Sequence, residues 1–79
     1  MSVDTFSRLE KIFRLVFKLK AEQDVMTVKK ESQHNWDSLA HTTLVSAIES
    51  EFDLYMNDAD MDSLTSFSAA QAYLAAKGR

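Results

Sequence analysis

FSRLEKIFRLVF, residues 6–17, is the stretch of this sequence that most clearly determines a fold. Its apolar residues recur at spacings of three, four, three and one, which form one stripe of a helix with about 3.6 residues per turn. These residues are Phe6, Leu9, Phe13, Val16 and Phe17, with Ile12 widening the stripe. We predict an amphipathic helix that packs this face on a core and is capped by Asp4 or Thr5.

The composition of the whole chain favours helices. The sequence has no proline and one glycine, Gly78, so it lacks the turn residues that a β-rich domain of this size needs. It also has no cysteine, which excludes disulfides, thiolate metal sites and a cysteine nucleophile. A length of 79 residues is enough for one domain, which we place over residues 1–79.

A second helix is predicted from Asp37-Ser38 onward, after a long connection over residues 20–36. We expect Val25, Met26 and Val28 to hold that connection against the core. The predicted buried face of the second helix consists of Leu39, Leu44, Ala47, Ile48 and Phe52, with Val45 at its edge.

The remainder of the chain predicts one short and one longer helix. Residues 53–63 carry four aspartates and indicate a loop with one helical turn, capped by Asn57 or Asp58. The last helix is predicted over residues 66–77, with Thr65 or Ser66 as its cap. Its apolar face consists of Phe67, Ala70 and Leu74. The predicted fold is all-α: a small bundle of three main helices plus one short helix.

Charge is distributed unevenly between the two halves of the chain. Residues 1–36 have a net charge of +2 and residues 37–79 a net charge of −5. Because nucleic-acid binding needs a basic face, the acidic half argues against it and permits a basic protein partner. No apolar run approaches the roughly 18 residues of a membrane span, and the N-terminus does not resemble a secretory signal. We therefore expect a cytoplasmic protein.

The tetrapeptide Trp36-Asp37-Ser38-Leu39 lies where the long connection meets the second helix. Asp37 is a natural N-cap, which places Ser38 at the first helical position with its hydroxyl toward solvent. A phosphate ester on that serine would be stabilised by the unpaired N–H groups and the partial positive charge of the helix start. Asp-Ser at a helix start is also a common structural cap, so the dipeptide alone leaves both interpretations open.

The sequence from residue 37 to residue 74, DSLAHTTLVSAIESEFDLYMNDADMDSLTSFSAAQAYL, resembles the acyl carrier protein family. The resemblance implies a carrier that is not itself an enzyme. It would hold acyl intermediates as thioesters on 4′-phosphopantetheine, which is transferred from coenzyme A to Ser38, with Asp37 and Leu39 beside the arm. The implied partners are a phosphopantetheinyl transferase and acyl-loading and acyl-transfer enzymes, and we expect a monomer.

The sequence also departs from the family pattern. His34-Asn35-Trp36 stands where glycine is frequent, and Ala40 and Thr43 replace acidic residues typical of fatty-acid carriers. Glu49 and Glu51 keep the acidic pattern, and the resemblance implies that they form the docking face. A tryptophan before Asp-Ser-Leu is more similar to specialised carriers of polysaccharide or secondary-metabolite pathways.

The same residues allow three other interpretations. A non-carrying helical interaction module would bind through its acidic second helix and leave Ser38 unmodified. A hydrolytic triad of Ser38, His41 and Asp37 lacks a glycine-rich oxyanion loop, so we expect no catalytic residue and a solvated His41. The aspartates at 58, 60 and 62 begin like a calcium loop, but Ser63 and Ala69 stand where it needs glycine and glutamate. We therefore expect no specific metal site.

Overall fold

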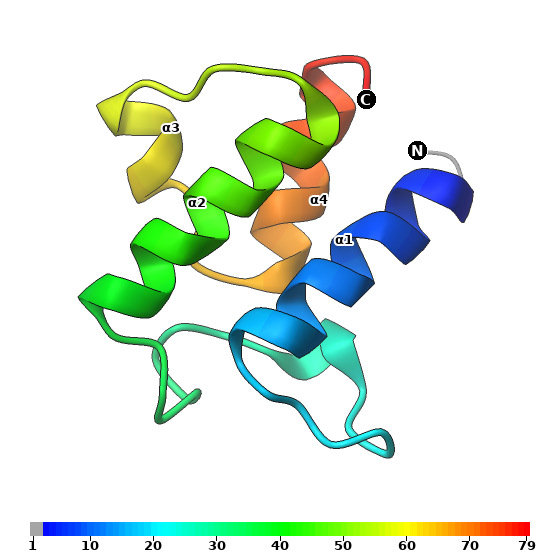
Figure 1. The fold of residues 1–79 in the computed structure, drawn as a ribbon, viewed down its shortest axis with the longest axis vertical. Coiled ribbons are helices and arrows are strands. Elements are labelled where there is room, and N and C mark those ends of the chain that lie inside the picture. Colours follow the sequence, from blue (N-terminus) through cyan, green and yellow to red (C-terminus); the bar gives the residue numbers. More distant parts are fainter. Residues whose placement is uncertain (1–2) are drawn as a thin grey trace.

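Three long helices and one short helix make up the structure, a computed structural model that describes residues 3–79 (Figure 1). The elements are α1 (Val3–Val16), the 3₁₀ turn η1 (Val25–Thr27), α2 (Ser38–Phe52), α3 (Asp58–Asp62) and α4 (Phe67–Ala76). This confirms the predicted all-α fold of three main helices plus one short helix.

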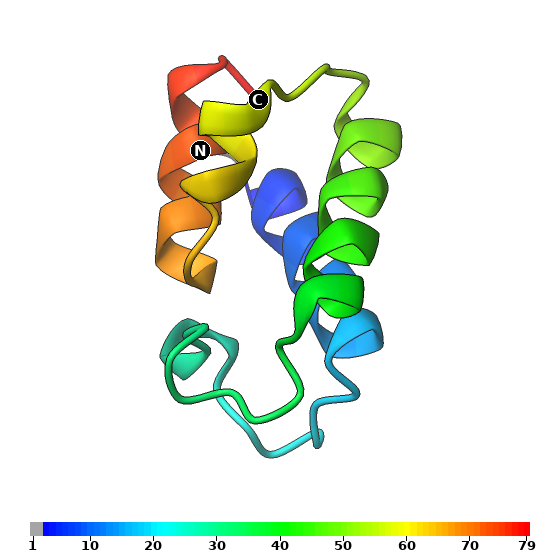
Figure 2. The same ribbon diagram turned by 90° about the vertical axis from the view of Figure 1, so that its left-hand side faces the viewer.

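The helix α1 lies between the other two long helices and contacts both of them. In Figure 1, α1 and α2 lie side by side with α4 behind them. The view turned by 90° places α2 and α4 on opposite sides, with the segment between α1 and α2 closing one end of the bundle (Figure 2). The start of α2 lies at this closed end.

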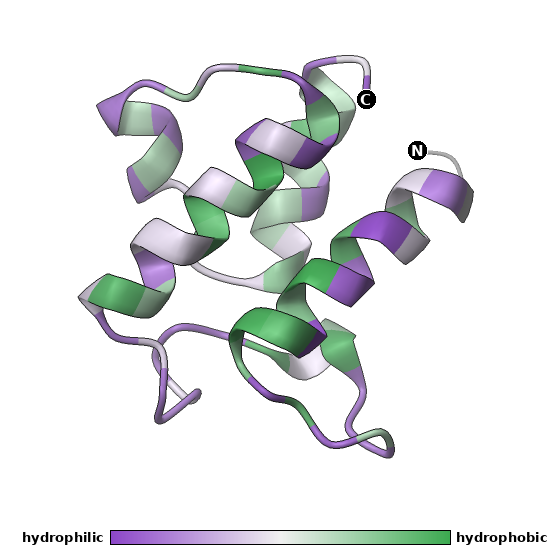
Figure 3. Ribbon diagram, in the orientation of Figure 1, coloured by the Kyte–Doolittle hydropathy of each residue, from purple (hydrophilic) through white to green (hydrophobic). Residues whose placement is uncertain are grey.

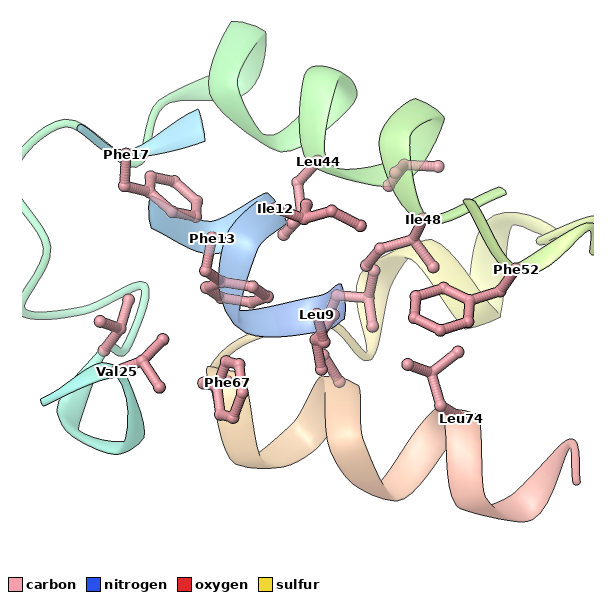
Figure 4. Packing of buried hydrophobic residues seen from close by; sticks show 14 of the residues in the cluster. Leu9, Ile12, Phe13, Phe17, Val25, Leu44, Ile48, Phe52, Phe67 and Leu74 are labelled. Atoms are coloured by element: carbon pink, nitrogen blue, oxygen red, sulfur yellow. The ribbon is translucent and has the colours of Figure 1, made fainter. Parts of the chain in front are cut away.

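Aromatic and aliphatic side chains fill the space between α1, α2 and α4 (Figure 4). The Phe13 ring is fully buried at the centre, with its centroid 5.0 Å from that of Phe67 and 5.6 Å from that of Phe17. Leu9, Leu44, Ile48 and Leu74 are also fully buried. Colouring by hydropathy shows the amphipathic pattern of α1, with polar residues on its outer side (Figure 3).

The long connection is held to α4 by backbone hydrogen bonds. Lys30 N donates to Thr65 O at 2.9 Å, and Phe67 N donates to Val28 O at 3.1 Å. Val25 and Val28 are buried as predicted, but Met26 is 43% exposed, so the prediction that it also anchors the connection is wrong. The 3₁₀ turn that begins at Val25 points this side chain away from the core.

The helix starts agree with the predicted caps in three cases and differ in one. Asn57 caps α3 and Ser66 caps α4, each through a side-chain oxygen that accepts a backbone N–H bond. The predicted cap of α1 is wrong, because the helix begins at Val3 and both Asp4 and Thr5 lie inside its first turn. Thr5 instead donates from Oγ1 to the carbonyl oxygen of Arg79 at 2.6 Å. The third confirmed cap is Asp37 at the start of α2, and it forms part of the candidate functional site.

Within residues 3–79, every helix is too short or too polar to cross a membrane.

Candidate functional site

Asp37 caps α2 and sets the position of Ser38. Its Oδ1 accepts a hydrogen bond from Ala40 N at 2.8 Å, and its carbonyl oxygen accepts one from His41 N at 2.9 Å. Ser38 is therefore the first residue of the helix, as predicted, and it is exposed. Within residues 3–79 its hydroxyl has no hydrogen-bond partner. The site thus offers an accessible hydroxyl on a rigid element.

Two shallow hollows flank this helix start. One has a volume of about 330 Å³ and is lined by Lys30, Trp36, Asp37, Ser38, His41 and Thr42. The other has a volume of about 270 Å³ and is lined by Val16, Lys18, Asn35, Asp37, Leu39, Ala40 and Thr43. Each hollow contains one lysine. Because Lys18 and Lys30 lie 20 and 8 positions before Ser38, no local sequence motif identified them as site residues.

Trp36 closes the end of the bundle beneath Ser38. It is 6% exposed, and its ring centroid lies 4.5 Å from that of Phe17 and 5.9 Å from that of Phe13. The neighbouring Asn35 donates from Nδ2 to Phe17 O at 2.8 Å. The end of α1 therefore fixes the segment that leads into α2.

His41 connects Trp36 to α3. Trp36 Nε1 donates to His41 Nδ1 at 3.1 Å, which leaves His41 Nε2 to carry the proton and donate to Met61 O at 2.9 Å. The prediction of a solvated His41 is wrong, because its place on α2 turns the ring toward Trp36 and α3. Both ring nitrogens are engaged, and neither is bonded to Ser38.

Replacement of His41 by leucine is expected to lower the free energy of unfolding by about 1–3 kcal/mol. The change leaves the indole N–H of Trp36 and the carbonyl of Met61 without their partner. Urea unfolding followed by tryptophan fluorescence measures the loss. His34→Leu is the matched control, since His34 is exposed. Equal stability of the two variants would contradict the connecting role.

Leu39 faces solvent although it was predicted in the buried face of α2. It is 76% exposed, whereas Val45, predicted at the edge, is 5% exposed. Leu39 lies five residues before the buried Leu44, which is about 140° around the helix. It therefore lies on the outer surface next to Ser38, with its side chain lining the second hollow.

The two predicted docking acids, Glu49 and Glu51, lie toward the other end of α2 and make contacts within the chain. Glu49 Oε2 accepts a hydrogen bond from the backbone N of the fully buried Met56 at 2.9 Å. Glu51 Oε2 lies 2.6 Å from Arg8 Nε, and this hydrogen bond raises the pKa of Arg8 above its usual value. Substitutions of either acid therefore change intramolecular contacts as well as the surface charge.

Glu49→Ala is expected to lower the free energy of unfolding by about 1–3 kcal/mol, since it leaves a buried backbone N–H without an acceptor. Glu49→Gln keeps an acceptor oxygen and should lose less. Urea unfolding of the two variants beside the parent chain measures the difference. If both substitutions lower the free energy of unfolding equally, the hydrogen bond to Met56 does not account for the contribution of Glu49 to stability.

The acidic segment that begins like a calcium loop is used in helix capping. Asp60 accepts from Asn57 N through its side chain, and Asn57 accepts from Asp60 N, which together form a capping box. Across the described residues, no three His, Asp or Glu side chains converge as a metal site.

Comparisons of this chain with protein-family models, with curated proteins and with solved structures found no match.

Proposed function

We propose that this chain is an acyl carrier protein, which holds acyl groups as thioesters on a 4′-phosphopantetheine arm attached to Ser38. The observation that most supports the proposal is the exposed hydroxyl of Ser38 at the first position of α2, directly after the capping Asp37. Exposed Leu39 lies next to it and is open to contact with a partner enzyme. These are the three residues that the resemblance to carriers singled out.

The chemistry of this site fits a phosphodiester. Free N–H groups and the dipole at the start of a 15-residue helix favour a negative charge there, and Lys30 lines the adjoining hollow. When bound, the arm supplies the thiol that carries the acyl group, which the protein itself cannot supply because it has no cysteine. Asp37 and Trp36 hold the helix start in place, and Ser38 supplies the attachment oxygen.

In this proposal the chain is not an enzyme. The chain has two histidines, His34 and His41, one on either side of Ser38 in sequence. His34 is exposed, and the two ring nitrogens of His41 bond to Trp36 and Met61. Partner enzymes perform the transfer steps: a phosphopantetheinyl transferase adds the arm, and acyl-loading and acyl-transfer enzymes use it. They meet a helix start that is flanked by Lys18 and Lys30, with Glu49 and Glu51 farther along α2.

The second candidate is a non-carrying interaction module with unmodified Ser38. Its supporting observation is the exposure of two large apolar side chains, Leu39 at 76% and Leu15 at 70%. Apolar side chains on the surface contribute to binding when a partner covers them. The two candidates differ in intact mass, because only a carrier isolated from cells gains the arm.

The proposed function is tested by incubating the protein with coenzyme A and a broad-specificity phosphopantetheinyl transferase. We expect the intact mass to increase by one arm and peptide mapping to place it on Ser38. An arm on Ser63 or Ser66 would contradict Ser38 as the attachment residue. No arm with several transferases would exclude the carrier in favour of the interaction module.

A further inference from the structure

The imidazole ring of His41 is held by two partners of opposite kind. Trp36 Nε1 lies 3.1 Å from His41 Nδ1, and the carbonyl oxygen of Met61 lies 2.9 Å from His41 Nε2. An indole N–H can only donate a hydrogen bond, and a carbonyl oxygen can only accept one. Both bonds therefore form together only when Nδ1 carries no proton and Nε2 carries one, which is one tautomer of the neutral ring.

The bond between Trp36 and His41 spans the start of α2. Trp36 comes two residues before Ser38 and His41 three residues after it, so the bond joins the segment that enters the helix to its first turn. The capping residue Asp37 lies between the same two residues. Through Met61, the His41 ring also bonds to α3. His41 thus fixes the start of α2 relative to two neighbouring segments.

A second proton on the ring breaks the bond to Trp36. Histidine is the side chain that ordinarily changes its charge between about pH 5 and pH 8. In the protonated ring, Nδ1–H faces the indole N–H, and two donors cannot bond to each other, whereas the bond from Nε2 to Met61 O is kept. Because Trp36 is 6% exposed, its indole N–H has little access to water, and leaving it without an acceptor is unfavourable. We therefore expect the indole ring to shift toward solvent.

The charged groups around His41 do not offer a substitute for this bond. They come from the long connection, from the cap and from α3 on either side of Met61, and are Lys30, Asp37, Asp60 and Asp62. The carboxylates of Asp37 and Asp60 already accept backbone N–H bonds, and Asp62 is exposed. The α1 side chains that pack on Trp36 are uncharged phenylalanines. Among residues 3–79, no ion pair forms with His41.

We infer that His41 is a positioning residue for Ser38, and that its protonation in mild acid releases Trp36 and makes the start of α2 mobile. The release is a property of the folded chain, and its effect on attachment of the arm rests on the proposed function. A mobile segment has to be ordered when an enzyme binds it, which weakens binding. Acid should therefore slow attachment of the arm to Ser38.

The bond between Trp36 and His41 can be observed directly by NMR, because the chain has one tryptophan and so one indole N–H signal. The measurement is the ¹⁵N–¹⁵N coupling across the bond from Nε1 to Nδ1, taken from about pH 8 to about pH 5, while the ring ¹⁵N shifts report protonation of His41. We expect coupling in the neutral ring, its loss in the protonated ring, and concurrent changes in the amide signals of residues 38–40. Coupling that persists in the protonated ring, or amide signals that do not respond, would overturn the inference.

Attachment of the arm tests the consequence for Ser38. The parent chain and His41→Gln compete in one reaction for a broad-specificity phosphopantetheinyl transferase and coenzyme A, so the pH dependence of the enzyme affects both equally, and intact mass separates the products. Glutamine offers a carbonyl oxygen to Trp36 and an amide N–H to Met61 but does not titrate. From about pH 8 to about pH 6, loading of the parent relative to this variant should fall about two- to tenfold, the factor for loss of one neutral hydrogen bond.

Two further variants separate the bond from other effects of pH. Trp36→Phe keeps an aromatic ring but lacks the N–H, so its loading relative to His41→Gln should not change with pH. His34→Gln is the matched control, because His34 is exposed, and its loading should follow that of the parent. A constant ratio of the parent to His41→Gln would overturn the positioning role. If the parent never gains the arm, the proposed function fails, and the indole coupling still decides whether protonation releases Trp36.

Discussion

Ser38→Ala is expected to abolish attachment of the phosphopantetheine arm and to leave the fold intact. The Ser38 hydroxyl is exposed, and Asp37, one residue earlier, supplies the cap. Alanine also has a high helix propensity, so the free energy of unfolding should change by no more than about 0.5 kcal/mol. Intact mass after incubation with transferase and coenzyme A measures loading, and urea unfolding measures stability.

Asp37→Ala is the informative companion to this substitution. It removes the oxygen that accepts from Ala40 N and should cost about 1 kcal/mol of stability while leaving the attachment hydroxyl in the chain. The opposite pattern, in which Ser38→Ala unfolds the domain, would identify Ser38 as the structural cap. Attachment of the arm to Ser38→Ala would contradict the carrier assignment of this residue.

Phe13→Ala is expected to have the largest effect on stability, about 3–5 kcal/mol. The Phe13 ring is fully buried and lies within 6 Å, centroid to centroid, of Phe17, Trp36 and Phe67. Its removal leaves a cavity where α1 meets α4 and the closed end of the bundle. A domain of this length has a total stability of about 4–12 kcal/mol, so much of the folded population should be lost.

Urea unfolding followed by circular dichroism measures this effect on stability. Leu15→Ala is the matched control, because Leu15 lies on the same helix with 70% of its surface exposed and should change stability by no more than about 0.5 kcal/mol. If Phe13→Ala and Leu15→Ala unfold at the same urea concentration, the core is not centred on Phe13.

The sequence by itself determined those features that depend on neighbours along the chain. The apolar stripe of α1 could be predicted because a helix repeats about every 3.6 residues. Leu9, Phe13 and Phe17 are buried as predicted. The caps Asp37 and Ser66 were readable because each bonds to a backbone N–H three residues later. The all-α class and the position of Ser38 follow from these local signals.

Only the tertiary structure decided which side chains from distant segments meet. Leu39 faces solvent and His41 faces inward because contacts with α1, Trp36 and Met61 fix the rotation of α2, and its weak apolar periodicity left that rotation open. Glu49 bonds to Met56 N because the loop after α2 folds back on the helix. Lys30 reaches the surroundings of Ser38 because the long connection pairs with the start of α4, a contact between residues 35 positions apart. Such contacts depend on the three-dimensional path of the chain, which the spacing of residues within one helix does not determine.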